Sequence, residues 1–139
     1  MIRRPRPDVS VFAGAALFAG YSAQELAPLV PHADRLVVLP GAALAEAGRR
    51  PHEVLVLLSG EAYVAGGPDH GAAFAPGTVI GAREELAGEP HGATVVAGGG
   101  VSALVLTGPA FRWAVQSLPG LRGRLGLDQP AERADAAAA

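Results

Sequence analysis

The chain has 139 residues, of which 50% are hydrophobic and 17% are charged, so it can build one packed domain and is not a disordered chain. Its formal net charge of −2 gives no general attraction to nucleic acid, and the lack of cysteine excludes disulfides and thiolate zinc sites. No apolar run reaches the roughly 18 residues that a membrane helix needs. We therefore expect a cytoplasmic protein with no membrane span.

Residues 1–9 predict a flexible basic tail. MIRRPRP is basic and is followed by the apolar VFAGAALFAG, a pattern similar to a weak secretory signal. Pro5, Pro7 and Asp8 interrupt that pattern between the charges and the apolar run. A tail followed by a first helical turn within 11–18 is therefore the preferred interpretation, and export is the alternative.

The next segment predicts a short helix. Ser22-Ala-Gln-Glu25 has the spacing of a capping box, in which the serine and glutamate side chains satisfy the first free amides of a helix. Pro28 and Pro31 follow within two turns, so this helix is expected to be short or kinked.

From residue 34 onward the sequence consists of short apolar segments separated by turn-forming residues. Their spacing of about 8–12 residues predicts an antiparallel β-sandwich or roll and not a parallel α/β sheet. The eight predicted strands lie within residues 35–39, 43–48, 53–58, 61–66, 72–74, 78–80, 93–97 and 101–106.

Helical character returns after the last strand. Thr107 and Pro109 predict the start of a helix over 110–118, which Pro119-Gly120 ends. LRGRLGL adds one further turn. The Ala-rich segment QPAERADAAAA has no apolar face and predicts a disordered tail over 128–139, which leaves a domain over 10–127.

Several segments occur in the order and with the gaps of one known family. LFAGYSAQELAPLV, VLVLLSGEAYV, FAPGTVIGA and EPHGATVVA together resemble the cyclic-nucleotide-binding domains over about residues 17–125. The resemblance implies a mainly β fold with flanking short helices, an eight-stranded antiparallel β-roll. It also implies a non-enzymatic regulatory module with a pocket for a cyclic nucleotide, cyclic AMP or cyclic GMP.

The resemblance places the phosphate-binding loop at residues 80–95. In the family a glutamate follows the loop glycine and binds the ribose hydroxyl, and an arginine follows the loop proline and clamps the phosphate. This chain has Ala82 and His91 at those places. Losing both groups would remove roughly 3–6 kcal/mol, or two to four decades of affinity. The candidate ligand-binding residues are Gly81, Ala82, Arg83, His91, Gly92, Ala93 and Thr94.

Four alternatives stay open at this loop. Backbone amides near residues 81–83 could still face an anion, and Arg83 could replace the missing clamp or pair with a glutamate one turn away. His91 is either a pH-gated phosphate contact or a solvated loop residue. Glu84 or Glu85 could reach a ribose hydroxyl. Glu84, Glu85 and Glu89 against one arginine oppose an anion.

No catalytic constellation is predicted. His32, His52, His70 and His91 are scattered without metal-ligand spacing, and no triad can be assembled, so we expect neither a metal nor enzymatic activity. Only 14 residues follow Leu125, too few for a helix-turn-helix DNA-binding domain, so any output is expected to pass to a separate protein effector. The preferred hypothesis is an adaptor whose pocket has lost high-affinity cyclic AMP binding. The alternative is a sensor of cyclic AMP, cyclic GMP or another anionic nucleotide.

Overall fold

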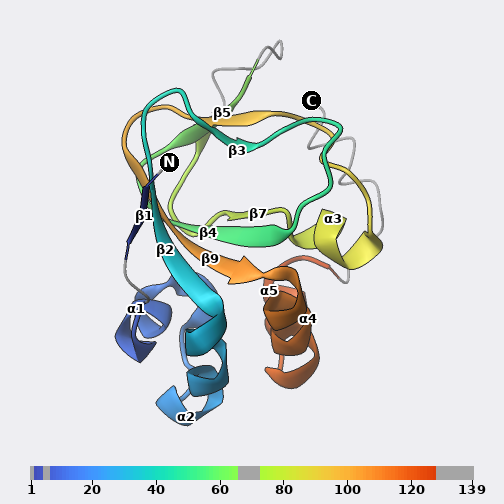
Figure 1. Ribbon diagram of the computed structural model, residues 1–139. Coiled ribbons are helices and arrows are strands. Elements are labelled where there is room, and N and C mark those ends of the chain that lie inside the picture. The colour runs from blue at the N-terminus through green and yellow to red at the C-terminus, as the bar shows by residue number, and fades with distance from the viewer. Residues whose placement is uncertain (1, 5–6, 66–72, 128–139) are drawn as a thin grey trace.

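The structure, a computed structural model, describes residues 2–4, 7–65 and 73–127 (Figure 1). The strands in this part of the chain are β1 (Ile2–Arg4), β2 (Ala33–Val38), β3 (Ala43–Ala45), β4 (Glu53–Ser59), β5 (Ala62–Val64), β6 (Ala73–Phe74), β7 (Val79–Ile80), β8 (Val95–Ala97) and β9 (Val101–Thr107). They form one sheet in the order β1-β2-β9-β4-β7 and a second in the order β3-β8-β5-β6, with antiparallel pairing throughout. The eight predicted strands all occur, which confirms the mainly β antiparallel fold.

The helical elements are short and flank the roll. They are α1 (Val9–Gly14), η1 (Ala16–Phe18), α2 (Ala23–Leu26), η2 (Ala27–His32), α3 (Ala82–Ala87), α4 (Gly108–Ser117) and α5 (Leu121–Arg124). Figure 1 shows α1, α2 and α4 together below the roll, while α3 lies at its side. Among the described residues, none of these helices is both long and apolar enough to cross a membrane.

Strands β4 and β9 pair in the middle of the larger sheet and are buried on both faces. Val54 and Val56 of β4 pack with the helices, whereas Leu55 and Leu57 pack between the two sheets. β9 alternates in the same way. Two cores therefore share one pair of central strands, which explains the nearly continuous apolar run EVLVLL.

The helix ends follow the local sequence. The capping box at α2 is present, since Ser22 N donates to Glu25 Oε1 over 2.8 Å and Glu25 N donates to Ser22 Oγ over 3.0 Å. The chain then continues as the 3₁₀ turns of η2, which accommodate Pro31. Thr107 caps α4 by accepting from Ala110 N at 3.2 Å.

The N-terminal residues differ from the predicted flexible tail. Residues 2–4 form β1 and pair antiparallel with β2, with Ile2 opposite Val37. The pairing satisfies backbone groups along an edge of β2 that would otherwise be open. Asp8 then caps α1 by accepting from Ser10 N at 3.0 Å. The predicted disordered tail at 128–139 lies outside the described residues.

Candidate functional site

A cavity of about 300 Å³ opens between the two sheets of the roll. Its apolar wall comes from strands of both sheets and consists of Ala45, Val64, Phe74, Val79, Ile80 and Val95. Its polar rim comes from α3 and the loop that follows, with Thr78 added from the approach to β7. The arrangement can hold a small ring compound against the apolar wall and contact it from the rim.

The rim begins at Gly81, which precedes α3 with a φ of +92°. A side chain here would be strained by that backbone angle, and its Cβ would lie 3.3 Å from Glu53 O and 3.4 Å from His91 Cε1. Glycine therefore lets the start of α3 and the His91 ring approach each other closely.

His91 is held in place by its backbone. Its amide donates to Arg49 O over 2.9 Å, and its carbonyl accepts from Gly48 N over 2.9 Å. The half-buried side chain lies beside Gly81 and lines the cavity. His91 thus lies on the rim of the cavity and is not a fully solvated loop residue.

Arg83 also lines the cavity, but its guanidinium is already engaged. Arg83 Nη2 donates to Gly126 O over 3.1 Å, a bond from α3 to the residues after α5. No ion pair of Arg83 with a glutamate one turn away is present among the described residues. That alternative from the sequence is wrong because the residues one turn away, Leu86 and Ala87, are apolar, and the side chain reaches across to the C-terminal segment.

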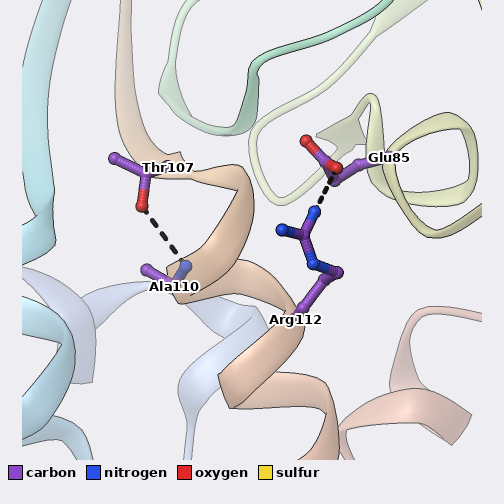
Figure 2. A network of polar contacts seen from close by, with 4 residues as sticks. All are labelled: Glu85, Thr107, Ala110 and Arg112. Carbon is purple, nitrogen blue, oxygen red and sulfur yellow. Dashed lines mark hydrogen bonds and ion pairs between the residues drawn. The ribbon is translucent and has the colours of Figure 1, made fainter. Parts of the chain in front are cut away.

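The glutamate that does form an ion pair is Glu85. Its carboxylate lies 2.5 Å from Arg112 Nη1 of α4, and the two side chains are 11% and 46% exposed. Figure 2 shows this pair beside the Thr107 cap of α4. The Glu85 carboxylate packs against Gly108, where a Cβ would overlap it. Glu85 therefore faces α4 and does not line the cavity.

The seven candidate ligand-binding residues do not all meet at the cavity. Gly81, Arg83, His91, Gly92 and Ala93 line it, whereas Ala82 and Thr94 do not. The Ala82 methyl group is buried in the helix-side core.

Thr94 Oγ1 accepts from Ala47 N over 3.0 Å, so this hydroxyl ties the β8 segment to the end of β3. Thr94 thus has a structural contact at this place.

Sequence reasoning missed most of the wall. Phe74, Val64 and Val79 are half-buried residues on three separate short strands. Alternation along each strand was the available signal, but strands of two or three residues carry little of it.

The charge of the lining opposes an anion. Among the described residues of the lining, Arg83 contributes one positive charge and the carboxylates of Glu84 and Glu89 contribute two negative charges. Glu84 and Glu85 also occupy the first turn of α3, where carboxylates offset the positive end of the helix.

The described residues include no group of three or more His, Asp or Glu side chains arranged to hold a metal ion. The groups at the rim can accept and donate hydrogen bonds, and the apolar wall can bury a ring.

No protein-family model and no curated protein matches the chain in sequence. Solved structures do match in fold. A cAMP-binding acyltransferase from Mycobacterium smegmatis, solved as a point mutant, superposes with a TM-score of 0.73 at 28% identity, covering 92% of this chain and 41% of that one. The regulatory subunit of a cAMP-independent protein kinase A from Trypanosoma brucei superposes with a TM-score of 0.73 at 21% identity, covering 88% and 46%.

A cyclic nucleotide-binding domain from Methylobacillus flagellatus superposes with a TM-score of 0.67 at 22% identity, covering 91% of this chain and 76% of that one. The chain thus spans less than half the length of the acyltransferase and of the kinase regulatory subunit. The shared part is the roll with its flanking helices.

Proposed function

We propose that this chain, which has the fold of a cyclic-nucleotide-binding domain, is a non-enzymatic regulatory module that has lost high-affinity cyclic AMP binding and acts through a protein partner. The observation that carries the proposal is the rim of the cavity. His91 stands where the resemblance expects the phosphate clamp, and the Ala82 methyl group is buried in the core.

The size of the loss follows from the groups that are missing. An arginine offers two parallel donors to a phosphate and is always charged, whereas His91 can present one ring donor to it. Each hydrogen bond to a charged group contributes about 1.5–3 kcal/mol. Glu84 and Glu89 add repulsion toward an anion. We therefore expect cyclic AMP to bind more weakly than about 10 μM.

The link from the cavity to the helices supports a regulatory role. Arg83 connects α3 to Gly126, and Glu85 connects α3 to Arg112 of α4. A displacement of α3 at the rim would therefore pull on α4 and on the residues that follow α5. A regulatory domain and a regulatory subunit of protein kinase A are among the proteins of similar fold.

A sensor is the second candidate function, and the open cavity is the observation that favours it. Protein interiors are close-packed, so an unfilled space of about 300 Å³ between two sheets favours a role in ligand binding. The acyltransferase of similar fold is named as cAMP-binding. On this candidate function the cavity still takes a small molecule.

Calorimetric titration of cyclic AMP and cyclic GMP at pH 6 and pH 8 tests the proposal. For the wild-type chain we expect a dissociation constant above about 10 μM for each of the two nucleotides. His91→Arg restores one forked donor and is expected to tighten cyclic AMP binding about tenfold to a hundredfold. His32→Arg adds the same charge on exposed η2, outside the cavity, and is the matched control.

A dissociation constant below about 10 μM for either nucleotide in the wild-type chain would contradict the loss of the clamp. Tighter binding at pH 6 than at pH 8 would identify protonated His91 as its replacement, provided that His91→Gln removes the difference. An equal gain in His91→Arg and His32→Arg would show that net charge, and not the rim position, sets the affinity.

A further inference from the structure

We infer that the cavity of the roll selects an uncharged, nucleoside-sized ring compound over its phosphorylated, anionic counterpart. This rests on the proposed loss of the phosphate clamp and names the class of ligand for the same cavity. Three features of the described residues carry it, namely the wall, the carboxylates of the rim, and the engagement of Arg83.

The wall suits a ring. Phe74, Ile80 and Val95 bring aromatic and aliphatic surface from both sheets to one space. A volume of about 300 Å³ lies at the small end of ligand pockets, so a compact ring compound suits it better than an extended one. The burial of apolar ring surface would supply most of the affinity.

The carboxylates of the rim suit hydrogen-bond donors. Glu84 is half-buried and Glu89 is exposed, and both line the cavity. Neither carboxylate has a hydrogen-bond or ion-pair partner among the described residues. An ionised carboxylate only accepts, so it is satisfied by ligand N–H and O–H groups and repels a phosphate, which brings acceptors and negative charge.

Arg83 does not reverse this preference. Arg83 Nη2 is bonded to Gly126 O, so turning the guanidinium fully toward a phosphate would break the bond between α3 and the C-terminal segment. Losing that bond would offset part of the attraction. A ligand without charge makes no such demand on Arg83.

Adenosine and cyclic AMP are the probes, because they share base and ribose and differ in the charged cyclic phosphate. Calorimetry on the full chain at low salt is expected to show adenosine binding at least about tenfold more tightly than cyclic AMP. The double variant Glu84→Gln/Glu89→Gln keeps the shape of both side chains and removes their charge. In it the preference for adenosine is expected to fall to about threefold or less.

Glu46→Gln/Glu61→Gln removes the same charge from exposed positions outside the cavity, and its preference is expected to match that of the wild-type chain. Thermal unfolding of each variant confirms that it is folded. An unchanged preference in Glu84→Gln/Glu89→Gln would overturn the inference, because the carboxylates would not be what discriminates.

The two proposals can fail separately. Both proposals would be overturned if the dissociation constant of cyclic AMP were below about 10 μM and also below that of adenosine. Weak cyclic AMP binding that is still tighter than adenosine binding, or no heat from either compound, would overturn the preference for an uncharged ring and leave the loss of the clamp standing.

Discussion

Replacing Gly108 by alanine tests the link between α3 and α4. An alanine Cβ at this position would overlap the Glu85 carboxylate, which is the free end of a flexible side chain and can therefore move away. Moving it separates Glu85 from Arg112, a pair that is now joined over 2.5 Å. Gly108→Ala is thus expected to break a specific ion pair without disturbing the backbone.

The magnitude follows from exposure. Arg112 is 46% exposed and Glu85 is 11% exposed, so the pair is worth more than a fully solvated one but much less than a buried one, about 1–2 kcal/mol. Alanine recovers a few tenths of a kcal/mol through helix propensity at the first residue of α4. The expected net loss is about 1 kcal/mol in the free energy of unfolding.

Urea unfolding of Gly108→Ala, Glu85→Ala and the double variant measures the coupling between the two positions. We expect Gly108→Ala to be neutral or slightly stabilising once Glu85 is alanine, which gives a coupling of about 1 kcal/mol. Gly14→Ala, with nothing within 4 Å of the added Cβ, is the control for the effect of alanine alone. An equal cost of Gly108→Ala in both backgrounds would refute the contact between Gly108 and Glu85 as its cause.

Three further predictions concern the framework around the site. Gly60→Ala places a Cβ against Gly100 O at a φ of +85°, so we expect a loss of about 2 kcal/mol or more, and a loss under 0.5 kcal/mol by urea unfolding would contradict this. Arg124→Ala removes donors to two carbonyls of the η1 segment and a cation 4.7 Å from the Tyr21 ring, with an expected loss of about 1–2 kcal/mol; unchanged hydrogen exchange in η1 would count against that anchor. Hydrogen bonding from Ser10 holds the pKa of Asp8 below its usual value, so its cap stabilises the fold above about pH 4 and is lost as the pH falls through the lowered value; Asp8→Asn is expected to flatten that dependence of Tm, and an identical profile would argue against the cap.

Most of the roll could be predicted because its strands are separated by residues with a strong local preference. Gly60 and Gly77 both adopt positive φ at turns between strands, a conformation that other residues avoid. β1 could not be predicted in the same way. The segment Ile2–Arg4 is short and contains two arginines, and it forms a strand only because β2 offers an open edge.

The candidate site was predictable where it is local and hidden where it depends on distant pairs. The fixed gap between Gly81 and His91 located the rim, and the two residues do meet. The bond of Arg83 to Gly126 joins residues 43 positions apart, and the pair Glu85–Arg112 joins residues 27 positions apart. Nothing in the sequence near α3 identifies these distant partners, because they become neighbours only through the packing of the C-terminal helices.

The two sheets are built differently, and this affects which parts of the molecule can unfold locally. β4 and β9 are shared by both cores, so their amides are expected to exchange with solvent only when the whole domain unfolds. The smaller sheet is built from strands of two or three residues and contributes only to the core between the sheets. We therefore expect strands β5 and β6 to separate from the roll in a local opening that leaves the helix-side core intact. Such a motion would give solutes a route to the interior without global unfolding.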